Sequence, residues 1–119
     1  MMLKKIKKLK PLIDLKQNKL DSELRKLAQL NEDLRENSKL LILRQEQYLK
    51  SSKELNHKFS DKKRQGFEIA SQGVDFLREE WSYLFRNKKK IEKDIEQQKH
   101  MIRIARDQLD NIKKLKEKY

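Results

Sequence analysis

The sequence predicts an all-α protein, a long two-helix antiparallel coiled-coil hairpin with its turn near residues 59–66. Three observations predict this fold: a highly charged composition, a seven-residue hydrophobic repeat in both halves, and a turn-like segment between them. Charged residues make up 42% of the chain and hydrophobic residues 35%, whereas an average globular domain has roughly 25% charged residues. Too little apolar surface exists for a rounded core, so long helices that bury one stripe are favoured.

The predicted first helix, about residues 12–58, has one strong hydrophobic column and one weak one. The strong column takes every seventh residue: Ile6, Ile13, Leu20, Leu27, Leu34, Leu41, Tyr48 and Leu55. The column four residues further on starts at Leu24 and continues with Asn31, and it is mostly polar or small. Pro11 fits the first turn of a helix, so we expect residues 1–10 to form a separate basic N-terminal extension of this single hairpin domain.

The predicted second helix, about residues 64–117, repeats the pattern more completely. Its two columns are Phe67, Val74, Trp81, Lys88, Ile95, Ile102 and Leu109, and Ala70, Leu77, Leu84, Ile91, Gln98, Ala105, Ile112 and Tyr119. Ser60 and Asp61, which suit a turn or a helix N-terminus, precede Gly66, which lowers helix propensity. The chain is therefore expected to reverse near Asp61.

An antiparallel hairpin requires that the numbers of facing residues add to one constant total. The strong columns satisfy this condition, and they pair hydrophobic residues in every layer except the one that places Leu34 opposite Lys88. The register places Trp81 opposite Leu41, so we interpret Trp81 as core. One continuous helix that dimerises, or a hairpin that assembles further, are alternatives that the periodicity leaves open.

A second apolar column lies outside the predicted helix contact. Ile69, Phe76 and Tyr83 are seven residues apart, and Phe85 is also off the contact columns. A repeated apolar column of this kind indicates a surface for a partner, or rings that pack on the hairpin itself or on a second copy. We assign Ile69, Phe76, Tyr83 and Phe85 as candidate partner-binding residues and leave these occupants open.

The hairpin would also gather positive charge where the chain ends meet. The formal net charge is +12, which favours an acidic partner. Runs of lysine near both ends would converge at the open end of the hairpin. The candidate residues there for binding an acidic partner are Lys4, Lys5, Lys7, Lys8, Arg103, Arg106, Lys113 and Lys114.

No pattern in the sequence indicates catalysis. His57 and His100 are expected to face solvent, far apart on the hairpin, and the chain has no cysteine and no glycine-rich phosphate loop. We therefore expect a protein that is not an enzyme and that uses no cofactor, metal or small-molecule substrate. No continuous apolar run is long enough for a signal peptide or a membrane span, which predicts a cytoplasmic protein.

In its length, its lysine- and glutamate-rich composition without cysteine, and its predicted hairpin, the chain resembles the FliJ/YscO family of central stalk proteins of bacterial type III secretion systems, in particular the shorter SsaO/EscO-like virulence members. The resemblance covers nearly the whole chain and rests on architecture and charge. It implies a stalk that enters the pore of a hexameric secretion ATPase and promotes its assembly and activity. It also implies contact with an export gate protein or secretion chaperones, at the cytoplasmic side of the inner-membrane apparatus.

Two other function classes compete with the stalk. A basic coiled coil could bind nucleic acid, but acids interleave both helices and few aromatic rings accompany the lysines of the open end. A structural adaptor could bind membrane surfaces through Leu3, Ile6 and Leu9 among the first lysines, although so short a segment would bind weakly alone. Nucleic acid, membrane lipid and an acidic protein surface are therefore the three classes of partner that experiments must separate.

Overall fold

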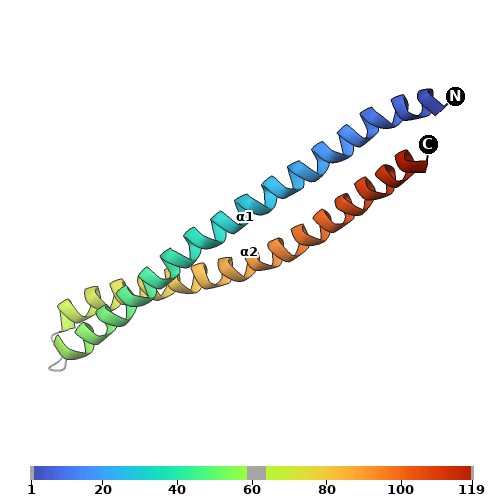
Figure 1. The fold of residues 1–119 in the computed structure, drawn as a ribbon. Coiled ribbons are helices and arrows are strands. Elements are labelled where there is room, and N and C mark those ends of the chain that lie inside the picture. Colours follow the sequence, from blue (N-terminus) through green and yellow to red (C-terminus); the bar gives the residue numbers. More distant parts are fainter. Residues whose placement is uncertain (1, 59–63, 119) are drawn as a thin grey trace. The chain divides into compact units, whose positions relative to one another are not determined.

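The chain folds into two long helices, α1 (Met2–Lys58) and α2 (Arg64–Lys118), with no strand in either range (Figure 1). The computed structural model describes the backbone of residues 2–58 and 64–118 and the side chains of residues 7–57 and 66–118. The helices form two compact units: a terminal unit of residues 1–32 and 93–119, and a central unit of residues 33–92. In each unit α1 and α2 run in opposite directions and pack together, which confirms the predicted all-α hairpin.

The start of α1 differs from the prediction. The helix begins at Met2 and contains Pro11, so residues 2–10 are its first turns and not a separate extension. Proline removes one backbone hydrogen bond and crowds the carbonyl four residues earlier. The lysines and leucines around Pro11 are good helix formers, and they continue the helix through it. The predicted reversal at Asp61 lies outside the described residues.

The core of the terminal unit follows the predicted register. Leu20, Ile102, Ala105 and Leu109 form a buried cluster, and Ile13 and Leu27 pack against it. These residues include the facing pairs that the sequence predicts, Leu20 with Ile102 and Ile13 with Leu109. The seven-residue repeat therefore identified the correct contact column on both helices.

The second contact column of α1 corrects the prediction. It lies three residues after the strong column and not four, because Glu23 and Asn37 are only 2% and 6% exposed while Leu24 and Asn31 are exposed. A helix has 3.6 residues per turn, so both spacings reach the same side. The true column is Lys16, Glu23, Leu30, Asn37, Arg44 and Ser51, and each of its members is at least half-buried.

Glu23 is the buried polar centre of the terminal unit. The Nε2 atom of Gln98 donates to the carboxylate of Glu23 at 2.5 Å and to its backbone carbonyl at 2.9 Å. Lys19 and Lys26 add ion pairs with N–O distances of 3.0 and 3.5 Å. These hydrogen bonds, first from Gln98 and then from Lys19, lower the pKa of Glu23 to about 2.

Polar contacts also join the helices within the central unit. Asn37 donates from Nδ2 to the carbonyl of Leu84 at 2.9 Å, and its Oδ1 atom accepts from Asn87 at 2.8 Å. One heptad later, Arg44 Nε lies 2.7 Å from Glu80 Oε2. No buried side-chain nitrogen or oxygen among the described residues lacks a hydrogen-bond partner. The helices therefore meet along one apolar column and one polar column.

The aromatic residues of the central unit are less buried than the register implies. Trp81 is half-buried and stacks on Tyr48, with ring centroids 5.6 Å apart and planes at 27°. Leu41 is buried as expected, but Phe67, which was assigned to a contact column, is exposed. The predicted register places Trp81 opposite Leu41, and Tyr48 lies one heptad further along α1. The stacked rings therefore reach diagonally across the helix contact instead of filling one layer.

Candidate protein-binding surfaces

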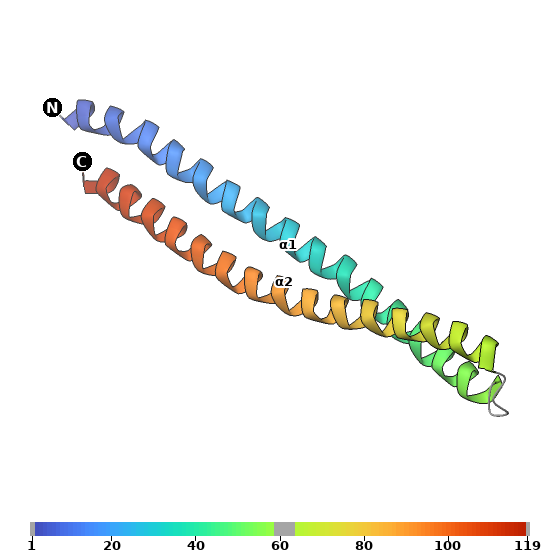
Figure 2. The ribbon, with the colours of Figure 1, turned by 180° about the vertical axis from the view of Figure 1, so that it is seen from behind.

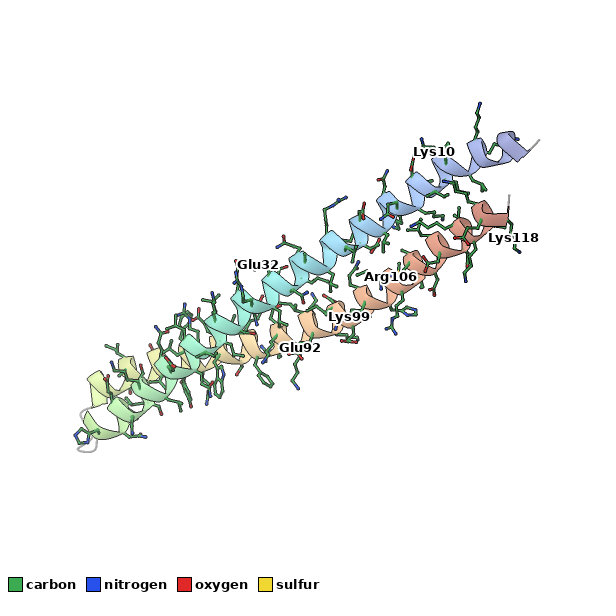
Figure 3. The ribbon with its side chains drawn as sticks, viewed as in Figure 1. Lys10, Glu32, Glu92, Lys99, Arg106 and Lys118 are labelled. Carbon is green, nitrogen blue, oxygen red and sulfur yellow. The ribbon has the colours of Figure 1, made fainter. Side chains whose placement is uncertain are left out.

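The terminal unit carries a basic end, defined here by Lys7, Lys8, Arg103, Arg106, Lys113 and Lys114. The first turns of α1 and the last turns of α2 lie side by side (Figures 1 and 2). All six side chains are exposed, and the neighbouring Lys10, Arg106 and Lys118 can be followed in Figure 3. The side chains of Lys4 and Lys5, which belong to the same prediction, lie outside the described residues.

The lysines near the two ends of the chain differ in what they do for the helices. Lys116 and Lys118 lie in the last turn of α2, where positive charge complements the helix dipole. The start of α1 has no acidic residue in its first turn, and residues 4–10 hold five lysines. Positive charge at a helix N-terminus is unfavourable. The lysines in the first turn of α1 therefore gain no stabilisation from the helix dipole.

The central unit exposes an apolar column, defined by Ile69, Phe76 and Tyr83 on α2. Their side chains are 74%, 60% and 61% exposed. Residues seven apart lie along one face of a helix, so the three side chains form one stripe. Phe85 is also exposed but lies on another face, where Lys89 Nζ is 5.1 Å from its ring centre and Trp81 lines the same shallow hollow.

A groove between the two helices of the central unit runs next to the apolar column. Small and apolar residues line most of it: Ser51, Glu54, Leu55, Ala70, Gly73, Val74 and Leu77. Gly73 follows Ile69 by four residues and precedes Phe76 by three, so it lies beside both on the helix surface. The groove therefore opens at the edge of the exposed stripe.

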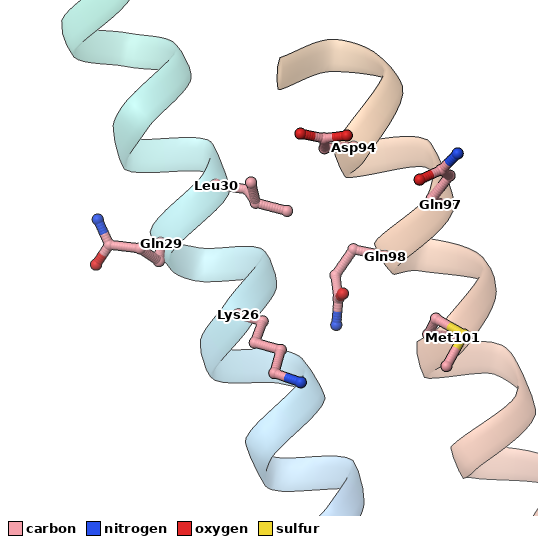
Figure 4. Close-up of a pocket in the computed structure, with 7 residues that line it drawn as sticks. All are labelled: Lys26, Gln29, Leu30, Asp94, Gln97, Gln98 and Met101. Carbon is pink, nitrogen blue, oxygen red and sulfur yellow. The ribbon is translucent and has the colours of Figure 1, made fainter. Parts of the chain in front are cut away.

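A second groove lies in the terminal unit (Figure 4). Its lining residues are Lys26, Gln29, Leu30, Asp94, Gln97, Gln98 and Met101. Lys26, Leu30 and Gln98 point toward the space between the helices, whereas Gln29 points away from it (Figure 4). The amide of Gln98 is already engaged by Glu23. The groove brings together no nucleophile with a base and no pair of carboxylates.

The described side chains also form no recognisable metal centre. No group of three or more histidine, cysteine, aspartate or glutamate side chains in this part of the chain could hold a metal ion. His57 and His100 are each exposed on their own helix. Neither helix, over its described residues, is apolar enough along its length to cross a membrane. The surfaces with distinctive chemistry are the basic end and the apolar column.

Comparisons with protein-family models, curated proteins and solved structures found no match to this chain. Function must therefore be argued from the surfaces themselves. The sequence singled out the residues of the basic end and of the apolar column, but it missed the polar contact column and the groove beside Gly73. The polar contact column does leave a signal in the sequence. Its pairs Lys16–Gln108, Asn37–Asn87 and Arg44–Glu80 have the same total of residue numbers, as an antiparallel hairpin requires.

Proposed function

We propose that this chain is the central stalk protein of a bacterial type III secretion system, acting in the cytoplasm at the inner-membrane apparatus. In this proposal the protein is not itself an enzyme. Its basic end binds the pore of the hexameric secretion ATPase and promotes assembly and activity of the hexamer. Its apolar column contacts the export gate protein or secretion chaperones. The resemblance in architecture, length and charge to the FliJ/YscO stalk proteins suggests these partners.

The single observation that supports the proposal most is the exposed basic end on an antiparallel helix pair. Lys7 and Lys8 from α1 and Lys113 and Lys114 from α2 belong to one unit and are all exposed. A pair of helix ends is narrow enough to enter a ring, and an acidic lining would attract it electrostatically. The same feature would serve nucleic-acid binding, so the experiment must separate the two.

The test measures the ATPase rate and the size of a secretion-system ATPase with and without the purified protein, at about 50 and about 300 mM salt. We expect faster hydrolysis and a hexamer-sized complex, both weakened by salt. Neutralising Lys7, Lys8, Lys113 and Lys114 to glutamine should weaken binding by about tenfold or more, because several ionic contacts are lost together. Phe76→Asp and Tyr83→Asp should leave this binding intact.

A matched variant controls for the change in net charge. Lys39, Lys50, Lys53 and Lys90 are exposed lysines of the central unit, and their replacement by glutamine removes the same four charges elsewhere. Equal loss of ATPase binding in both variants would mean that general charge, and not the basic end, is responsible. If no complex and no stimulation occur, a basic nucleic-acid-binding protein or a structural adaptor becomes the better assignment, and binding to RNA and to anionic liposomes would separate these.

A further inference from the structure

We propose that the apolar column Ile69, Phe76 and Tyr83 binds one basic amphipathic helix of a partner protein. The inference builds on the proposed function only in treating this column as a second partner surface. The structural basis is the exposed stripe, the acidic residues around it and the groove at its edge. All three features belong to the central unit.

The stripe has the spacing that a docked helix requires. Its three large side chains repeat every heptad on α2 and remain mostly exposed. A partner helix that lies along α2 presents apolar side chains with the same spacing, and the two stripes then bury each other. A contiguous exposed apolar patch of this kind marks a protein-interaction site. The column therefore fits a helical occupant better than an extended or single-residue contact.

The charge of this segment specifies a basic occupant. The chain as a whole has a net charge of +12, yet residues 66–85, between basic stretches at 62–64 and 86–90, contain four acids and one arginine. Glu79 follows Phe76 by three residues and precedes Tyr83 by four, so its exposed carboxylate lies beside both rings. Glu80 flanks the same two rings on the other side and pairs with Arg44. Asp75 pairs in the same way with Arg78, so lysines and arginines on the edges of a partner helix would complement mainly Glu68 and Glu79.

The groove offers a place for one anchoring side chain. A Cβ atom built at Gly73 would meet nothing within 4 Å, and Ser51 and Ala70 also contribute little volume to the lining. Because Gly73 lies between Ile69 and Phe76 on the helix surface, an apolar side chain from the partner can enter there while its neighbours cover the stripe. Such an anchor in a preformed hollow is typical of strong protein contacts.

A second copy of the chain is the main competing occupant, and the charges disfavour it. A two-fold contact would place the same segment against itself. Glu68 and Glu79 of each copy would then approach acids of the same sign, while the one arginine of the segment, Arg78, already pairs with Asp75. An anionic membrane would meet the same repulsion. A basic helix is the occupant that the stripe and its acids favour together.

The experiment titrates the intact protein into a labelled helical peptide of leucine and lysine about three heptads long, with leucines along one face, and measures fluorescence anisotropy. A scrambled peptide of the same composition has the same charge but no apolar face. We expect binding of the first peptide only. Replacing Phe76 and Tyr83 with alanine should weaken binding by about tenfold or more, since the anchoring rings are lost. Glu79→Lys should weaken it more at low salt than at high salt.

Two variants separate binding from folding. Gly73→Leu fills open space and removes a helix-weakening glycine, so it should keep or raise stability and still block the peptide. Leu15→Ala with Leu115→Ala removes exposed apolar side chains from the terminal unit and should have no effect. Unchanged binding in both the Phe76/Tyr83 and the Gly73 variants would overturn the proposal. So would a dimer, seen by sedimentation, that the Phe76/Tyr83 variant dissociates. No ATPase is present, so failure here leaves the proposed stalk function standing.

Discussion

At the residue scale, Glu23 is a buried carboxylate whose charge the fold uses. Its 2% exposure would disfavour ionisation, yet the donors Gln98, Lys19 and Lys26 overcome that cost and lower its pKa from 4.5 to about 2. A carboxyl group with a lowered folded-state pKa stabilises the fold above its unfolded pKa. That contribution is lost as pH falls through the folded value. Here the loss falls between about pH 4.5 and pH 2.

Glu23→Gln should therefore change how stability depends on pH. The amide still accepts a hydrogen bond from Gln98 but carries no charge for Lys19 and Lys26. We expect the variant to be less stable than the wild type at pH 7 and the difference to shrink as pH falls toward 2. Thermal unfolding followed by circular dichroism measures this difference. Glu92→Gln, an exposed glutamate (Figure 3), is the matched control. A difference that stays constant down to pH 2 would contradict the assignment.

At the scale of the elements, the polar column determines how α1 and α2 are aligned. Asn37 is 6% exposed, and it hydrogen-bonds to the backbone carbonyl of Leu84 and to the side chain of Asn87, both on α2. Polar groups at a helix contact commonly select one register at some cost in stability. A shift by one residue would separate Asn37 from Asn87 and Arg44 from Glu80. The apolar column supplies the attraction, and the polar column selects the alignment.

Two variants test this division of roles between the apolar and polar columns. One is the single variant Asn37→Ala, and the other is the double variant Asn37→Leu with Asn87→Leu. The alanine variant loses two hydrogen bonds and some packing, so we expect about 1–2 kcal/mol of destabilisation. The double leucine variant removes both amides together, and we expect stability close to or above that of the wild type, because no buried amide is left without its partner. Urea unfolding at pH 7 measures both. A double variant that loses more stability than the alanine variant would contradict this account.

The sequence predicted the apolar half of this contact and not the polar half, for a physical reason. Leu20, Ile102 and Leu109 are recognised because hydrophobic residues repeat at the core period. Glu23, Asn37 and Arg44 interrupt that signal, so hydrophobic periodicity could not distinguish their column from that of Leu24 and Asn31. The exposure of Ile69, Phe76 and Tyr83 was predictable because their positions lie off the contact. The groove at Gly73 depends on how neighbouring side chains pack, which periodicity does not contain.

At the scale of the whole molecule, charge opposes the folded state. The chain carries 31 lysines and arginines against 19 acids, and most of these side chains are exposed. Folding brings like charges closer, and the resulting repulsion is screened by salt. Salt would also weaken exposed ion pairs. Two of these are Arg78–Asp75 and Lys99–Glu96, each with an N–O distance of 3.5 Å. Exposed pairs of this kind contribute little.

Added salt should therefore stabilise this protein. We expect the midpoint of thermal unfolding to rise by several degrees between about 20 and about 500 mM sodium chloride, because 1 kcal/mol corresponds to roughly 4–8 °C for a chain of this size. The increase should be smaller when Lys7, Lys8, Lys113 and Lys114 are glutamine, since that variant begins with less repulsion in the terminal unit. The midpoint should not depend on protein concentration, because the helices that pack together belong to one chain. A midpoint that falls with salt would show that ion pairs outweigh repulsion, and one that rises with protein concentration would show that the stable form contains more than one copy.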